Sequence, residues 1–276
     1  MIKKLLAVLG VFILIFSNNV INVTNSSNAI YREKYYCGTN YFDTGLNFTH
    51  IENEVYYDDY EIIDNHLERF CPNYDNINHT NSCAPLAGTI LIGYYDYEFE
   101  NLIPNFVSGS YYNNTFTYRP RTSKVQAVKD SLYNLMGTNS IEPGTSVNQF
   151  KTGLQSYINN CGYNISYNSC GNNFNLQTAL GYFNNQMPIA LFLTGYEYYP
   201  ENGLYREDGY YLMGGRLSLS THVCIAYGYR QLNYYNDGEL FRSDNYLIVV
   251  YGDGTQGLLA LNTNTGIDEA YGIDIY

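Results

Sequence analysis

The sequence predicts an α+β fold in which helices come first and an antiparallel sheet follows them. Apolar residues recur with helical spacing up to about residue 185, whereas short runs rich in β-branched and aromatic residues occur after it. Helical and strand segments that are separated along the chain in this way are typical of the α+β class. The chain has 276 residues without an internal repeat or a linker, which is sufficient for one domain with a sizeable core.

The chain opens with the features of a secretory signal peptide. A pair of lysines precedes an apolar run, Leu5–Phe16, that is too short to cross a bilayer as a helix. We expect cleavage near Ala29, so that residues 1–29 are the signal peptide and residues 30–276 form the exported domain. The protein is therefore expected to be secreted or at the cell surface, without a stable membrane anchor; an uncleaved anchor is the alternative.

The charge of the exported part argues against a nucleic-acid partner. The whole chain has 14 Lys and Arg against 26 Asp and Glu, and residues 1–29 contain two of the lysines and no acidic residue. The exported domain therefore has 12 basic and 26 acidic residues, a net charge of −14. Such a surface repels a phosphate backbone, and no basic cluster interrupts it.

Helices are expected after an irregular, polar segment at residues 30–75, in which we expect short strands and turns. Their predicted ranges are 83–100, 122–136, 146–159 and 175–185. The first three show apolar stripes with helical spacing, and Pro104 and Gly162 are stop signals beyond the first and the third. The stripe of the first helix consists of Leu86, Ile90, Gly93, Tyr94 and Tyr97.

Strands are expected in the second part of the domain. The predicted ranges are 188–193, 222–229, 245–252 and 270–276. Between the first two lies a long segment, 194–220, that is rich in Gly and Tyr and is predicted to be a loop. Because long loops often carry function, we expect this one to border the binding cleft.

Six cysteines occur, all in the exported part. Outside the cell, an even number favours disulfides. Cys161 and Cys170 lie in turn-like surroundings and are expected to pair, while Cys37 and Cys71 could form a second bridge. Cys224 lies in an apolar run and is expected to be a buried thiol. The sequence contains neither C-x-x-C nor H-E-x-x-H, so no metal site is expected.

The remaining cysteine, Cys83, lies in a segment that favours a nucleophile, NSCAPLAG. Asn81 or Ser82 can cap the helix, and Pro85 suits the first turn. The helix dipole there favours the thiolate, which is the nucleophilic form, and backbone N–H groups can stabilise an oxyanion. A disulfide or packing cysteine, the alternatives, does not need this arrangement.

A nucleophilic cysteine needs a base, and His222 is the histidine best placed to be one. His50, His66 and His79 lie in polar, loop-like sequence, where a solvated surface position is the default. His222 instead opens the apolar strand THVCIAYGYR. A histidine at a strand start that faces a helix N-terminus can reach a thiol there. A structural histidine in the core or at a sheet edge is the alternative.

These motifs, in this order, resemble the papain-like cysteine peptidases, and among them the secreted bacterial relatives of cysteine-peptidase family 39, the double-glycine (bacteriocin-processing) peptidases. The family shows an Asn-x-Cys-x-Pro helix start, found here in NSCAPLAG, and a His-x-x-x-x-x-Gly-Tyr strand, found here in HVCIAYGY. The resemblance covers roughly residues 70–255. It implies a papain-like fold, with the nucleophile at a helix N-terminus packed on a C-terminal antiparallel sheet, Cys83 as nucleophile and His222 as general base and acid.

The resemblance is weaker for the residue that orients the histidine. In the family an Asn or Asp does so, but the hydrophobic register puts Val250 or Tyr251 at that position. Asp253 is the nearest carboxylate, so it is our candidate, with a structural turn aspartate as the alternative. Several asparagines precede Cys83, and we select Asn78 as the amide of the oxyanion hole.

The expected function is hydrolysis of peptide bonds by a thiolate of Cys83 paired with protonated His222. The expected partner is a peptide or protein substrate, and the chemistry needs no cofactor. Three alternatives remain open at this point: a papain-like cell-wall amidase, a transglutaminase, and a catalytically inactive binding or adhesion module.

Overall fold

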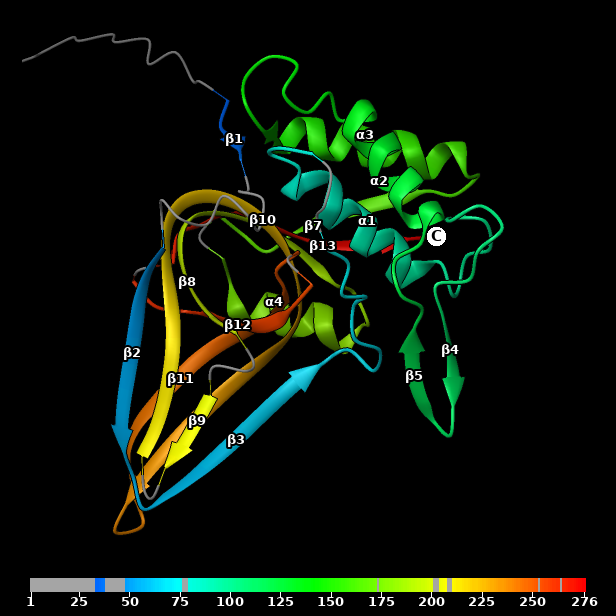
Figure 1. The fold of residues 1–276 in the computed structure, drawn as a ribbon. Helices are drawn as coiled ribbons and strands as arrows, with labels where there is room; N and C mark the ends of the chain where they lie inside the picture. Colours follow the sequence, from blue (N-terminus) through cyan, green and yellow to red (C-terminus); the bar gives the residue numbers. More distant parts are fainter. Residues whose placement is uncertain are drawn as a thin grey trace, which may run out of the picture. The chain divides into compact units, whose positions relative to one another are not determined.

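The computed structural model of the chain describes most of residues 33–276 (Figure 1). It describes residues 33–37, 48–75, 79–172, 174–200, 204–207, 210–252, 254–263 and 265–276. The signal peptide expected at residues 1–29 lies outside these ranges. Within them, no helix combines the length and apolar character that a membrane crossing requires.

A single long strand, β10 (Tyr210–Asn236), organises the main sheet (Figure 1). Its first half pairs with β2 (Phe48–Tyr56) and β8 (Ile189–Pro200), and its second half pairs with β3 (Asp59–His66) and β11 (Glu239–Val250). Every pairing in the sheet is antiparallel, as the sequence predicts. The remaining strands of this sheet are β7 (Ile165–Ser169), β9 (Leu204–Glu207), β12 (Gln256–Ala260) and β13 (Ile267–Ile275).

Part of this sheet closes into a ring. β12 pairs with β11 on one side and with β8 on the other, and β8 also pairs with β10. The ring β8–β10–β11–β12 therefore brings the strand that contains His222 close to the end of β11 and to the turn that follows it.

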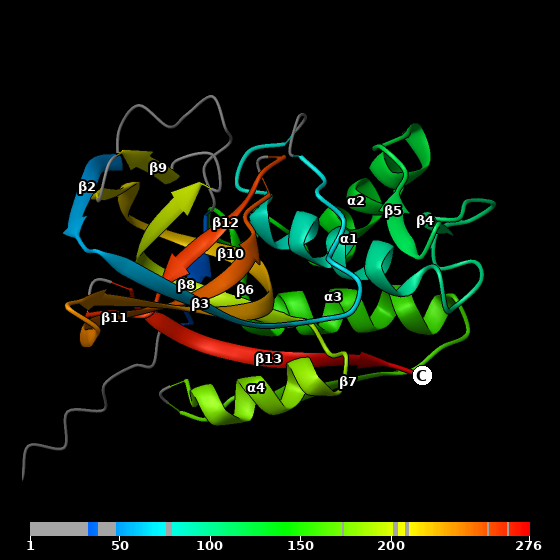
Figure 2. The same ribbon diagram turned by 90° about the horizontal axis from the view of Figure 1, so that it is seen from below.

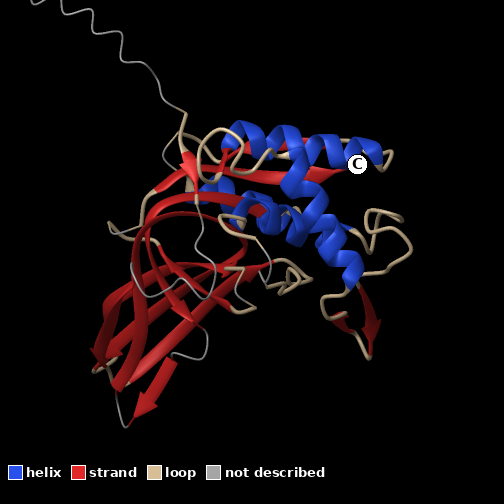
Figure 3. Ribbon diagram, turned by 45° about the horizontal axis from the view of Figure 1, so that its top comes forward, coloured by secondary structure: helices blue, strands red, loops and turns tan. Residues whose placement is uncertain are grey.

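Helix α1 (Cys83–Tyr95) lies between the other helices and the sheet. Every one of its residues is buried, and it packs against α2 (Ser123–Leu135), α3 (Val147–Asn160) and β10. Figures 2 and 3 show α1, α2 and α3 gathered on one side of the sheet. A helix that is apolar on all sides is stable only when it is surrounded, so α1 is the central element of the domain.

The other helices confirm the predicted ranges closely. α3 begins with a capping box, in which the Ser146 side chain accepts from the backbone N–H of Gln149 and the Gln149 side chain accepts from that of Ser146. α4 (Leu176–Asn184) lies apart from the others and packs against β3 and β10 (Figure 2). Two small sheets complete the described fold: β1 (Tyr35–Tyr36) with β6 (Thr145–Ser146), and β4 (Gly109–Tyr112) with β5 (Thr115–Tyr118).

The structure corrects the prediction that helices precede the sheet. β2 and β3 lie before α1, within the segment 30–75 for which short strands and turns are expected, and both belong to the main sheet. Both strands pair with β10, and the side chains of β3 are largely exposed. An edge strand with little buried surface has a polar sequence, so its apolar alternation is too weak to indicate the full length of the strand.

The predicted loop at 194–220 is also wrong. Its described residues continue β8, form β9 and begin β10. The Gly and Tyr content has a packing origin, because a Cβ at Gly215 would lie 2.5 Å from the Tyr199 ring and one at Gly257 would lie 2.6 Å from the Tyr198 ring. Glycine here makes room for tyrosine rings on a sheet.

The first helix is shorter than predicted, ending at Tyr95 instead of residue 100. The carboxylate of buried Asp96 accepts hydrogen bonds from the backbone N–H groups of Ile103 (2.7 Å) and Ser108 (2.8 Å). These bonds fold the following chain back on the helix end. Tyr97, predicted to belong to the apolar stripe, is 42 % exposed as a result.

None of the six cysteines, all of which lie in the described part of the chain, forms a disulfide. The expected Cys161–Cys170 pair is excluded by β7, because five extended residues between them span about 15 Å. A disulfide requires Cα atoms within about 7 Å. Cys224 is buried, as predicted.

Replacing Gly153 by Ala should lower the free energy of unfolding by about 1–3 kcal/mol, as overpacking does. A Cβ there would lie 2.5–2.8 Å from side-chain and backbone atoms of Met136 at the end of α2. Gly181→Ala on α4 is the control, since nothing lies within 4 Å of its new Cβ, and it should be neutral or stabilising by up to about 1 kcal/mol. Urea denaturation measures both; equal midpoints would contradict the prediction.

Candidate active site

Cys83 is the first residue of α1, as predicted. Ser82 stands at the N-cap position, but its hydroxyl donates to the His79 carbonyl (2.9 Å) and does not cap the helix. The first helical hydrogen bond runs from Leu86 N to Ser82 O (3.0 Å), and Pro85 has no N–H. Helical bonding therefore does not use the N–H groups of Cys83 and the following alanine.

The segment Glu33–Cys37 covers the thiol of Cys83. Cys83 Sγ lies 3.8 Å from the carbonyl oxygen of Tyr36, and the next backbone N–H, that of Cys37, donates to Thr221 Oγ1 over 2.9 Å. One peptide group thus contacts both the start of α1 and the residue before His222. The Cys83 sulfur and the Thr221 hydroxyl oxygen are consequently at most about 9 Å apart.

Three kinds of contact hold this covering segment in place. Lys34 forms an ion pair with Asp268 (2.9 Å), which also accepts from the Tyr36 hydroxyl (3.2 Å). The Tyr36 ring packs edge-on against Phe192 at a centroid distance of 5.1 Å, and β1 pairs with β6. The segment therefore joins the helical side of the domain to the sheet, and Cys83 is only 4 % exposed beneath it.

His222 lies on β10 with its imidazole fixed by one hydrogen bond. Nε2 is 2.9 Å from the carbonyl oxygen of Tyr251. A carbonyl can only accept, so Nε2 carries the proton and Nδ1 holds a free lone pair. Nδ1 is buried and has no hydrogen-bond partner. The unpartnered nitrogen is therefore the basic one.

Burial keeps this imidazole neutral. Removal from water lowers the pKa of His222 from 6.5 to about 4, and the hydrogen bond to Tyr251 offsets this only in part. The Tyr251 ring stacks on the imidazole at a centroid distance of 4.3 Å, which excludes water from that face. At neutral pH the imidazole of His222 is thus uncharged.

Two further observations place Cys83 and His222 in the same region. Cys224 lies two residues after His222, on the same face of β10, and burial together with the Cys83 thiol raises its pKa. Gly252, next to the carbonyl that holds His222, lies against the first turn of α1, since a Cβ there would be 2.9 Å from Leu86. The start of α1, β10 and the turn after β11 therefore meet at one point, and β10 lies beside α1 in Figures 1 and 2.

The atom that orients the imidazole of His222 belongs to the main chain, so the search for a suitable side chain did not find it. The hydrophobic register puts Val250 or Tyr251 at the position of the orienting residue, and neither side chain is a carboxylate. The structure instead holds His222 through the main-chain carbonyl of Tyr251. Asp253 and Asn78 lie outside the described residues, so their assigned roles stay predictions.

Two tyrosines of the segment 194–220 contact the site, from a strand instead of a loop. The Tyr196 ring is 5.6 Å from the imidazole between centroids, and its hydroxyl hydrogen-bonds that of Tyr251. Tyr198 stacks on the other face of Tyr251 at 4.7 Å. His222, Tyr251 and Tyr198 form a stacked column that fixes the plane of the imidazole.

Comparison with known proteins gives no match from which a function could be inferred. No protein-family model matches the chain, and no curated protein matches its sequence.

His222 should make the stability of the protein depend on pH. Because its folded pKa is about 4 and its ordinary value is 6.5, the unfolded chain takes up a proton first as the pH falls. The stabilising contribution is complete above pH 6.5 and is lost towards pH 4, amounting to about 3 kcal/mol. Urea denaturation across this range should show the loss in the wild type and not in His222→Gln. Parallel curves for the two proteins would show that His222 is solvated.

Weakening the covering segment should expose Cys83. Asp268→Ala removes the partner of both Lys34 and the Tyr36 hydroxyl, so alkylation of Cys83 by iodoacetamide should become about threefold faster or more. Asp64→Ala is the control, since Asp64 has a similar exposure and an ion pair with Arg230. Peptide mapping by mass spectrometry measures the rate at Cys83. The same rate in both variants would mean that the segment does not control access.

Proposed function

We propose that this chain is a cysteine peptidase of papain-like type, with Cys83 as the nucleophile and His222 as the general base. One observation carries the proposal: a buried histidine is fixed through Nε2 while its basic Nδ1 remains unpartnered in the region where α1 begins with a cysteine. A structural histidine in the core would be expected to satisfy both ring nitrogens. Nucleophilic catalysis requires a free basic nitrogen within reach of a thiol, and Cys83 lies in the same region as His222.

The proposed reaction starts from a neutral pair. As Cys83 Sγ attacks the carbonyl carbon of the substrate, Nδ1 of His222 takes the thiol proton. N–H groups at the start of α1 stabilise the oxyanion, and the imidazolium then gives its proton to the leaving amine. Water, activated by the same nitrogen, hydrolyses the thioester and restores the thiol.

The Tyr251 carbonyl takes the part that an Asn or Asp side chain plays in related peptidases. It holds the Nε2–H tautomer and accepts a stronger hydrogen bond when the ring becomes charged. A carbonyl has no full negative charge, so it stabilises the imidazolium less than a carboxylate would. The lowered pKa of His222 agrees with this difference.

Burial of the site favours a second candidate, a catalytically inactive binding module. Cys83 and His222 are each 4 % exposed, so a substrate reaches them only when the covering segment moves. A packing cysteine and a core histidine would be equally buried. The two candidates differ in whether Cys83 reacts.

A library of internally quenched fluorogenic peptides tests the proposal. The wild type should cleave members of the library, and Cys83→Ala and His222→Ala should each lower turnover by about a thousandfold or more. Because the base has a pKa of about 4, kcat/KM should stay level down to about pH 5 and should not fall at pH 6.5.

Undiminished cleavage by Cys83→Ala would reject the assignment. Lack of cleavage by the wild type, together with no alkylation of Cys83 even in Asp268→Ala, would establish the inactive module.

A further inference from the structure

A cavity of about 170 Å³ lies at the end of the strand ring β8–β10–β11–β12 that is remote from His222. β12 ends at Ala260, opposite Tyr246, whereas β11 extends beyond this pair to Glu239. The cavity lies beside this extension, and its lining includes Glu197, Tyr199, Arg242, Asp244, Tyr246 and Asn262. Along β11, Tyr246 is about 13 Å from Val250, the last residue before the turn that holds His222. The cavity is therefore separate from the candidate active site.

Strand pairing puts the lining side chains on one face of the sheet. Residues that lie directly opposite each other in neighbouring strands share a face, and every second residue of a strand returns to it. Tyr246 lies opposite Ala260, and Leu258, two residues earlier on β12, lies opposite Tyr199. Tyr199 and Tyr246 therefore face the same side. The charged residues that follow them on this face are Glu197 on β8 and Arg242 and Asp244 on β11.

Glu197 is a charged side chain that the fold keeps buried at the cavity wall. It is 4 % exposed, and its carboxylate accepts hydrogen bonds from the Tyr199 hydroxyl and from Asn262 Nδ2 (2.9 Å). Burial and this carboxylate raise the pKa of Tyr199, so its hydroxyl keeps the proton that it donates. Because burying a carboxylate costs free energy, its placement beside a cavity favours a binding role.

Arg242 and Asp244 form an ion pair that can bond a hydroxylated ligand. Nε of Arg242 donates to Oδ1 of Asp244 (2.9 Å), and Nη2 lies 2.8 Å from Oδ2. These contacts leave other N–H groups of the guanidinium and further lone pairs of the carboxylate for a ligand. The pair is thus neutral as a whole, and it offers donors and acceptors side by side.

The lining favours a neutral ligand that is rich in hydroxyl groups. A hydroxyl both donates and accepts, so it can bond guanidinium and amide N–H groups as well as carboxylate oxygens. The carboxylate of Glu197 repels an anion, and the N–H groups of Arg242 and Asn262 do not bind a cation. The rings of Tyr199 and Tyr246, 5.7 Å apart between centroids, supply apolar surface for the C–H groups of a sugar.

We propose that this cavity binds one uncharged monosaccharide through its hydroxyl groups. The cavity has room for about ten water molecules, a volume that one sugar ring fills. None of its lining residues belongs to the candidate active site, so the inference is independent of the proposed peptidase function.

Saturation-transfer difference NMR tests the binding of individual sugars to the wild type. The neutral probes are glucose, galactose, mannose and N-acetylglucosamine, and the charged probes are glucuronate and glucosamine in its cationic form. At least one neutral sugar should bind with a Kd on the order of 1 mM, as expected for a ligand of this size. Glucuronate should bind about tenfold more weakly or not at all. No binding of any neutral sugar, or binding of glucosamine alone, would overturn the inference.

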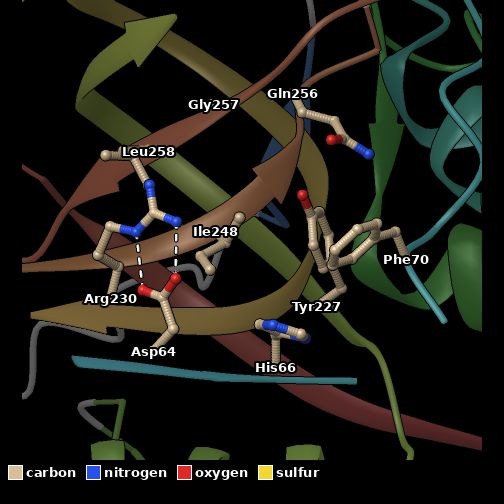
Figure 4. Close-up of a pocket in the computed structure, with 9 residues that line it drawn as sticks. All are labelled: Asp64, His66, Phe70, Tyr227, Arg230, Ile248, Gln256, Gly257 and Leu258. Carbon is tan, nitrogen blue, oxygen red and sulfur yellow. Dashed lines mark hydrogen bonds and ion pairs between the residues drawn. The ribbon is translucent and has the colours of Figure 1, made fainter. Parts of the chain in front are cut away.

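Two variants locate the sugar. Asp244→Ala removes one half of the ion pair at the cavity wall and should weaken binding about tenfold or more. Asp64→Ala is the matched control, because Asp64 binds Arg230 through two hydrogen bonds of 2.7 Å in the lining of another cavity (Figure 4). Asp64→Ala should leave the Kd unchanged. Asn262→Ala, at an exposed position after β12, should weaken binding about threefold or more.

Urea denaturation of each variant shows whether it is folded, and Asn262→Ala decides the outcome if Asp244→Ala is not. The wild-type Kd in the folded variants of the cavity wall, or an equal loss of binding in Asp64→Ala, would show that the sugar binds elsewhere and would overturn the inference.

Discussion

Burial of α1 on every side is the constraint on which the rest of the structure depends. The helix has no polar face, so α2 and α3 cover it from one side and β10 from the other. This position puts its first residue, Cys83, at the boundary between the helices and the sheet. A side chain at the end of a fully buried helix is held rigidly, and the elements that bury the helix also bring the other residues of the candidate site to it.

Tyrosine and glycine together account for the way the sheet is packed. The chain has 33 tyrosines and 24 glycines, and at Gly215, Gly257 and Gly272 the missing Cβ leaves room for a tyrosine ring. Buried rings supply the apolar area that Trp, which is absent, would otherwise provide. Tyrosine packing also shapes the candidate site, because the stacked rings of Tyr198 and Tyr251 fix the imidazole of His222 and keep water from it.

The burial that orders the site also determines its electrostatics. No described carboxylate contacts the imidazole; its hydrogen-bonded neighbour is a neutral carbonyl. Without a nearby negative charge, desolvation dominates and the imidazole stays neutral. In the proposed reaction, the thiol proton moves to the imidazole as the sulfur attacks, and access to the thiol depends on the segment Glu33–Cys37 that covers it.

The sequence by itself determined the α+β class, the positions of α1 to α4, and the placement of Cys83 at a helix start and His222 on a strand. These features follow from local periodicity, caps and stop signals, which neighbouring residues specify. Tertiary structure decided the rest: that β2, β3 and β9 pair with β10, that β7 separates Cys161 from Cys170, and that the Tyr251 carbonyl holds His222. Every residue has a main-chain carbonyl, so residue type does not indicate which carbonyl accepts the hydrogen bond from His222. Strand register and closure of the ring decide this.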